Sequence, residues 1–139
     1  MIAQDIMTEN PVTIRATNTV ADTCEVLQDM EIRHLPVVQG TELVGIISDR
    51  DLRSVHMPRL VDEETLQNVK ERYHAPISSL MSPDVVRVFP DSNVEEIIEL
   101  MLEHKVGAVP VVDAGTGDLL GIVSYVDILR SMHSMLAET

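Results

Sequence analysis

An α/β fold built from two copies of one unit is predicted by three observations on this sequence. The segment GIISDRD at residues 45–51 returns as GIVSYVD at residues 121–127, and shorter matches repeat in the same order. Each copy reads as strand, helix, strand, strand, helix. A unit of about 50 to 60 residues rarely buries enough surface alone. We therefore expect one domain in which the two units pack sheet to sheet with pseudo-twofold symmetry.

The first copy begins with a short strand at residues 12–14. Asn18-Thr19 then offers N-cap chemistry to a helix whose apolar positions have helical spacing. A strand at residues 35–38 enters through a proline, a second buried strand covers residues 43–47, and a helix starts near Ser48. The apolar positions of the first helix are Val20, Cys24, Leu27 and Met30.

The second copy repeats this order, displaced by 74 residues up to Val112 and by two more after a longer loop at residues 113–118. Ser92 and Glu95 have the spacing of a capping box. The helix that follows has apolar residues at i, i+3, i+4 and i+7, namely Val94, Ile97, Ile98 and Met101. The stretch between the copies holds a polar helix at residues 62–72, which His74-Ala75-Pro76 should end. The expected division is residues 1–56, a helical connector at 57–79, and residues 80–139.

Composition excludes several classes of function. Only 10 Lys and Arg stand against 23 Asp and Glu, for a net charge of −13, which argues against nucleic-acid binding. No apolar run approaches the roughly 20 residues of a membrane helix, and the N-terminus lacks a signal peptide, so a cytoplasmic protein without membrane insertion is expected. The single Cys24 is expected to be a packed thiol.

Each repeated segment has the form Gly-x-x-Ser-x-x-Asp. We call Gly45–Asp51 the first motif and Gly121–Asp127 the second motif. Glycine suits a strand that another backbone or a ligand approaches closely, and Ser48 and Ser124 lie where a strand gives way to a helix. The spacing would suit a nucleotide whose phosphate lies at the serine and whose ribose hydroxyls bind the aspartate three residues later. The same spacing also fits a capping box in which serine and aspartate serve only their own helix, so both interpretations stay open.

The paired segments resemble the CBS-domain family, named after cystathionine beta-synthase, whose tandem repeats are called Bateman modules. The resemblance rests on the Ile6-Met7-Thr8 and Leu80-Met81-Ser82 openings, the strand entries at residues 33–37 and 107–111, and the two motifs. It covers nearly the whole chain. It implies a regulatory module that binds AMP, ADP, ATP or S-adenosylmethionine in clefts between the repeats, requires no cofactor, and signals to a protein target that the sequence does not name.

The resemblance also implies a set of ligand-binding residues. The family pattern assigns Ser48 and Ser124 to phosphate, and Asp51 and Asp127 to ribose hydroxyls. Thr13 and Arg87 lie on the first strand of each copy, where the family holds adenine through main-chain groups. Because aromatic residues are scarce, the base should pack on aliphatic side chains. The remaining members of the expected site are Met7, Val12, Met81, Val86 and the strand-entry prolines Pro36 and Pro110.

Basic residues distinguish the two copies. Arg33 and His34 precede the strand of Pro36, as in the regulatory subunit of AMP-activated kinase, which this stretch resembles, and the alternative is a solvated basic pair. The second copy has Gly107 and Ala108 there, so the first site is expected to suit a charged nucleotide better. Arg50 and Arg53 are candidates too, although arginines on an amphipathic helix more often face solvent.

Two further expectations concern assembly and chemistry. An apolar stripe on the C-terminal helix predicts a homodimer. No hydrolase elbow, phosphate-binding Gly-Lys-Ser loop or zinc-binding helix is present, and the histidines at 34, 56, 74, 104 and 133 lack ligand spacing, so neither an enzyme nor a metal site is expected. The competing hypothesis is a structural or dimerisation module without a nucleotide ligand.

Overall fold

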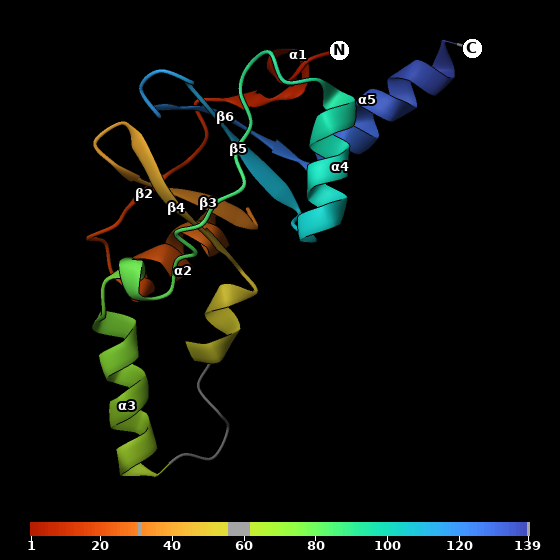
Figure 1. Ribbon diagram of the computed structural model, residues 1–139. Coiled ribbons are helices and arrows are strands. Elements are labelled where there is room, and N and C mark those ends of the chain that lie inside the picture. The colour runs from red at the N-terminus through yellow and green to blue at the C-terminus, as the bar shows by residue number, and fades with distance from the viewer. Residues whose placement is uncertain (31, 56–61, 139) are drawn as a thin grey trace. The chain divides into compact units, whose positions relative to one another are not determined.

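The computed structural model describes residues 1–30, 32–55 and 62–138, which form two compact units (Figure 1). The first-copy unit comprises residues 13–40 and 44–83, and the second-copy unit comprises residues 1–12, 41–43 and 84–139. The N-terminal residues 1–12 and the C-terminal residues up to 138 therefore belong to the same unit. The expected boundary at residues 56 and 57 lies outside the described residues.

The first-copy unit contains a sheet in the order β2-β3-β4, with β2 (Ile14–Arg15), β3 (His34–Gln39) and β4 (Glu42–Ser48), whose first two residues are counted with the second-copy unit. The strand β2 runs parallel to β3, as the crossover through helix α2 (Val20–Asp29) requires. The other elements are the 3₁₀ helices η1 (Asp51–Val55) and η2 (Ile77–Ser79) and helix α3 (Glu63–His74).

The second-copy unit contains a sheet in the order β1-β6-β5, with β1 (Thr8–Glu9), β5 (Ala108–Val112) and β6 (Leu119–Ser124). Both pairs are antiparallel, and an isolated parallel bridge joins Val88 to Val111. Helices α4 (Val94–His104) and α5 (Tyr125–Ala137) contact β5 and β6, and α1 (Ala3–Ile6) contacts α5. The two sheets of three strands confirm the mixed α/β fold with tandem repeats.

The opening segment of each copy is built into the sheet of the other copy. In the second-copy unit, Thr8 of β1 pairs with Ile122. In the first-copy unit, Ser82 forms the equivalent antiparallel bridge to Ile46, with N···O distances of 3.1 and 3.3 Å. Each unit is therefore composed of both halves of the sequence.

The caps of the helices follow the sequence closely, with two corrections. Thr19 and Asp22 form the capping box of α2, and α3 begins after Asp62 and ends before Ala75. The expected cap at Ser92 is wrong, because Asn93 caps α4 through Glu95 N–H while Ser92 Oγ accepts from Phe89 N–H. The helix expected from Ser48 is a 3₁₀ helix starting at Asp51 within the described residues.

Each unit has its own apolar core. Cys24 packs against the core of the first-copy unit, as expected, and burial raises the pKa of its thiol. Met30 departs from the expectation, since it is the C-cap of α2 and 54% exposed. The first-copy core includes Val20, Leu35, Val37, Ile47 and Ile77, and the second-copy core includes Ile97, Val109, Val111 and Val123.

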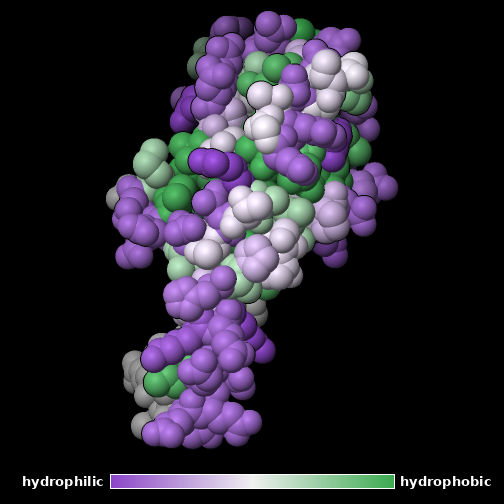
Figure 2. All heavy atoms as spheres, turned by 90° about the vertical axis from the view of Figure 1, so that its left-hand side faces the viewer, coloured by the Kyte–Doolittle hydropathy of each residue, from purple (hydrophilic) through white to green (hydrophobic). Residues whose placement is uncertain are grey.

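Helix α3 is polar over most of its surface, as the sequence predicts. Val69 is its buried residue, and the helix contacts α2 and η1. Figure 2 shows its segment, at the bottom of the view, as mostly hydrophilic spheres.

Candidate functional site

The first motif is a tight turn in which Asp51 accepts two hydrogen bonds from Ser48. The Ser48 backbone N–H and hydroxyl lie 2.8 and 3.1 Å from Asp51 Oδ2. In return, the Asp51 backbone N–H donates to Ser48 Oγ at 3.4 Å. The motif thus joins the end of β4 to η1 with both side chains half-buried.

The second motif repeats this geometry at the start of α5. Ser124 N–H and Oγ lie 2.9 and 3.1 Å from Asp127 Oδ2, and Asp127 N–H donates to Ser124 Oγ at 3.3 Å. Ser124 is the N-cap of α5, so the capping box that the sequence allows is confirmed. The capping uses Oδ2 of Asp127, while Oδ1 lies 3.8 Å from the Arg130 guanidinium.

Close approach explains both motif glycines. A Cβ at Gly45 would lie 2.5 Å from Met81 Sδ, and a Cβ at Gly121 would lie 2.6 Å from Met7 Sδ and 2.9 Å from the Thr8 carbonyl oxygen. Met7 and Met81 therefore each contact the motif of the opposite copy. These residues fill the space beside each glycine.

Basic residues surround the first motif. Asp49 N–H donates to the Arg33 carbonyl at 3.1 Å, which fixes the entry to β3 beside the motif. Burial lowers the pKa of His34; the nearby Asp49 and Asp51 carboxylates oppose this shift, while Arg33 and Arg50 reinforce it. His34 is therefore mostly neutral at pH 7, and the positive charge near this motif rests on the arginines.

The second motif has the same backbone contact but a different surface. Tyr125 N–H donates to the Gly107 carbonyl at 2.9 Å, the counterpart of the bond between Asp49 and Arg33. Ala108 is buried where His34 is half-buried. The basic pair of the first copy thus has no counterpart at these positions.

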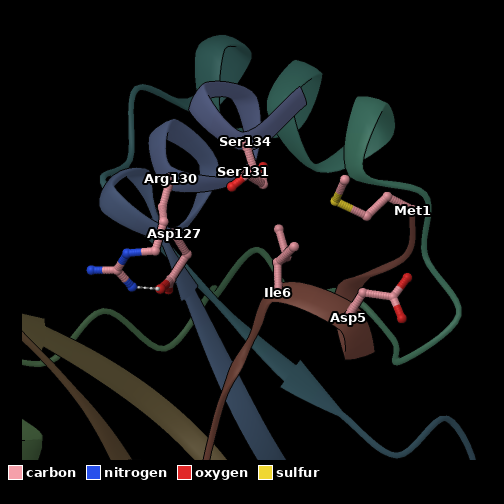
Figure 3. A pocket seen from close by; sticks show the side chains of 7 residues that line it. All are labelled: Met1, Asp5, Ile6, Asp127, Arg130, Ser131 and Ser134. Atoms are coloured by element: carbon pink, nitrogen blue, oxygen red, sulfur yellow. Dashed lines mark ion pairs between the residues drawn. The ribbon is translucent and has the colours of Figure 1, made fainter. Parts of the chain in front are cut away.

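A cavity of about 410 Å³ opens beside Asp127 in the second-copy unit. Figure 3 shows Asp127, Arg130, Ser131 and Ser134 on the α5 side, and Asp5 and Ile6 from α1 together with Met1 across from them. Among these residues, Asp127 alone was predicted from the sequence as a ligand-binding residue. The α5 residues could have been found from their spacing. Asp127, Arg130, Ser131 and Ser134 stand at i, i+3, i+4 and i+7, which places them on one helix face.

The structure divides the expected ligand-binding residues between the two units. Val86 and Met7 pack against the second-copy core, Met81 packs against the first-copy core, Pro36 and Pro110 are buried, and Val12 and Thr13 are exposed. The first-copy unit holds Thr13, Arg33, His34, Pro36, Ser48, Asp51 and Met81. The second-copy unit holds Met7, Val12, Val86, Arg87, Pro110, Ser124 and Asp127.

The described part of the chain contains no group of three or more His, Cys, Asp or Glu side chains arranged to hold a metal ion. His56 lies outside that part. Among the described helices, none has the length and hydropathy needed to cross a bilayer.

Comparison with known proteins identifies the family. The CBS domain model matches residues 3–57 and 77–134, so this chain belongs to the CBS-domain family and carries two tandem repeats. A CBS domain-containing protein of Dictyostelium discoideum is 34% identical over 98% of this chain and 94% of its own length.

Solved structures of CBS pairs share the fold. CBSX2, a CBS-pair protein of Arabidopsis thaliana, in complex with AMP is 30% identical, with a TM-score of 0.81 over 96% of this chain and 97% of that one. The CBS pair of protein MJ0100, in complex with 5′-methylthioadenosine and S-adenosyl-L-methionine, is 25% identical, with a TM-score of 0.75 over 95% and 99%. Related CBS pairs thus bind adenosine compounds.

Several relatives are longer. The chain spans 25% of the homoserine O-acetyltransferase of Methanococcus vannielii, at 30% identity over 94% of this chain. It spans 23% of the inosine-5′-monophosphate dehydrogenase of Methanocaldococcus jannaschii. CBS pairs therefore also occur within enzymes.

Proposed function

We propose that this CBS pair is a regulatory module that binds an adenosine-containing ligand, AMP, ADP, ATP or S-adenosylmethionine, at its motifs and has no catalytic role of its own. The observation that carries the proposal is the duplicated motif: each copy holds a serine and an aspartate in the same hydrogen-bonded geometry, beside a glycine that a segment of the opposite copy closely approaches. The AMP complex of CBSX2 supports the ligand class.

Different residues of each motif bind different parts of the ligand. Asp51 and Asp127 accept hydrogen bonds from ribose hydroxyls, and Ser48 and Ser124 bind the group attached to the ribose. The base packs on aliphatic side chains, including Val12 and Val86, and on main-chain groups near Thr13 and Arg87. Met7 and Met81 already contact the motif glycines, so they are the side chains best placed to move on binding.

Regulation follows from unequal affinity. A ligand shifts the module between two conformations only by the difference in its affinity for them. Because each motif lies beside a residue of the opposite copy, a ligand that displaces Met7 or Met81 changes how the opening segments are held. A target protein that contacts the module senses that change.

The alternative is a structural module without a nucleotide ligand. Its support is that the capping hydrogen bonds already use Asp51 Oδ2 and Asp127 Oδ2 within their own turns.

Exposed apolar residues on α5 favour association, and we propose that the chain forms a homodimer through them. These residues are Tyr125, Val126, Leu129, Met135 and Leu136.

The test is the ligand-induced change in melting temperature. AMP, ADP, ATP and S-adenosylmethionine are added separately to the wild type, to Asp51→Ala and to Asp127→Ala, and each shift is taken against the same variant without ligand. A ligand at about 100 times its Kd stabilises the native state by about 2.7 kcal/mol, and a variant that lacks its site loses that share.

The matched control is Asp62→Ala, which removes the N-cap of α3, where Asp62 Oδ1 accepts from Thr65 N–H at 2.7 Å. It has the cost of a lost cap, about 0.5–2 kcal/mol, but leaves both motifs intact. It should therefore keep the full ligand-induced shift. If no adenosine compound changes the melting temperature of the wild type, the adenosine-binding proposal is wrong and the structural alternative takes its place.

A further inference from the structure

Five charged or ionisable positions around the first motif are replaced by uncharged ones around the second. The backbones correspond, because the bond from Asp49 to Arg33 and the bond from Tyr125 to Gly107 occupy equivalent places. The repeat offsets of 74 residues before the longer loop and 76 after it relate the side chains. Arg33, His34, Asp49, Arg50 and Arg53 correspond to Gly107, Ala108, Tyr125, Val126 and Leu129.

The first motif carries an excess of positive charge. Arg33, Arg50 and Arg53 are exposed and lie in the segments that flank Ser48. Two carboxylates, Asp49 and Asp51, partly offset them. In a chain with 10 basic and 23 acidic residues, this is a favourable place for a phosphate, which carries about −1.5 to −2 charges at pH 7.

The second motif lacks this excess of positive charge. Arg130 is the guanidinium that lines the cavity beside Asp127, and the Asp5 carboxylate is used by the Ile2 backbone N–H at 2.9 Å. That guanidinium already lies 3.8 Å from Asp127 Oδ1 and is 74% exposed. A phosphate there would meet the Asp127 carboxylate and a guanidinium that is already paired with it.

The remaining surface near the second motif suits a neutral ligand. The positions that hold Asp49 and two arginines in the first copy carry no charge in the second copy, where they are Tyr125, Val126 and Leu129. Ile6 contributes an apolar wall to the cavity, and Ser131 and Ser134 contribute hydroxyls. The volume of about 410 Å³ lies within the range of small-molecule sites.

We propose that the cavity beside Asp127 binds an adenosine compound without a phosphate, whose 5′ substituent is neutral or cationic, while phosphorylated nucleotides bind at the first motif. This proposal rests on the adenosine-binding function proposed above. The two sites thereby prefer ligands of different charge. Both contain the same serine and aspartate, and the residues around the motifs determine which ligand each site prefers.

The experiment measures affinities on single-site variants of the full chain by isothermal titration calorimetry. Asp127→Ala retains the first motif and should bind AMP at least tenfold more tightly than adenosine. Asp51→Ala retains the second motif and should bind adenosine and 5′-methylthioadenosine at least tenfold more tightly than AMP. Raising the salt concentration from 50 to 500 mM should weaken AMP binding to Asp127→Ala and leave adenosine binding to Asp51→Ala nearly unchanged.

Exchanging the surrounding residues should exchange the preference. Gly107→Arg, made in Asp51→Ala, should gain affinity for AMP. Gly107 does not have a positive φ, so its backbone conformation is one that an arginine also adopts. Arg33→Gly with Arg50→Val, made in Asp127→Ala, should lose AMP affinity but keep adenosine affinity.

Lys70→Ala on α3 is the control for net charge, because this exposed lysine lies outside both motifs. It should leave the ratio of AMP to adenosine affinity unchanged in Asp127→Ala. The same preference for AMP in both single-site variants would overturn the charge division and keep the adenosine-binding function. Failure of every adenosine compound to bind either single-site variant or the wild type would overturn the function itself.

Discussion

Met81 Sδ lies so close to Gly45 that a Cβ on this glycine would be 2.5 Å from the sulfur. Met7 stands in the same relation to Gly121, at 2.6 Å, and there the Thr8 carbonyl oxygen adds a backbone contact at 2.9 Å. A side chain can rotate away more easily than a paired backbone can move. The two glycines therefore differ in how much a methyl group costs.

Gly121→Ala is expected to destabilise the protein by about 1–3 kcal/mol, because Thr8 is held by its pairing with Ile122. Gly45→Ala should cost less, since Met81 is flexible, and Met81→Ala in the same chain should recover part of the loss. Urea unfolding of the variants measures these differences. Equal costs for the two substitutions, with no recovery by Met81→Ala, would contradict the assignment.

Two positions on α4 separate packing from helix propensity. Ile97 is fully buried, so Ile97→Ala should lower the free energy of unfolding by about 2–5 kcal/mol. Leu102 is 73% exposed, and Leu102→Ala should change it by no more than about 0.5 kcal/mol. Chemical denaturation monitored by circular dichroism compares them. A large loss for Leu102→Ala would mean that its side chain is covered in solution.

His34 should make stability depend on pH. Burial lowers its pKa below 6.5 in the folded state, so its contribution is complete above about pH 6.5 and is lost as the pH falls through the lowered pKa. His34→Gln should therefore reduce the loss of unfolding free energy between pH 7.5 and pH 5. His133→Gln, at an exposed position on α5, is the control. An identical pH profile for the wild type and His34→Gln would contradict this origin.

The proposed homodimer predicts a mass twice that of the chain in solution. Leu129 and Leu136 are 62% and 73% exposed and seven residues apart on α5, so they lie on one face. Leu129→Lys with Leu136→Lys should shift the protein to monomer in analytical ultracentrifugation. Leu102→Lys on α4 introduces charge at an equally exposed leucine and should leave the dimer intact. A monomeric wild type at micromolar concentration would remove the proposal.

Local patterns in the sequence predicted much of the fold. The boundaries of α3 follow from Asp62 and the Ala75-Pro76 stop, and the capping box of Ser124 and Asp127 follows from its spacing. The predicted cap of α4 at Ser92 was wrong because Ser92 and Asn93 are both good N-cap residues. The path of the chain out of the preceding turn decides which of the two side chains reaches a free N–H of the helix.

The long-range pairings had no local signal. Nothing near Thr8 in the sequence indicates that it pairs with Ile122, since strand pairing is decided by surfaces distant along the chain. The cavity was missed for the same reason. The face formed by Arg130, Ser131 and Ser134 is visible as helical spacing, but its function as a wall depends on α1 lying across from it.

The exchange of opening segments has a consequence for any shorter version of this chain. A polypeptide carrying one repeat would have its own β-hairpin but would lack the edge segment that the other repeat supplies, as Thr8 supplies one to Ile122 and Ser82 to Ile46. Two such polypeptides could complete both sheets by swapping their first segments with each other. Joining both repeats in one chain makes this exchange of segments intramolecular.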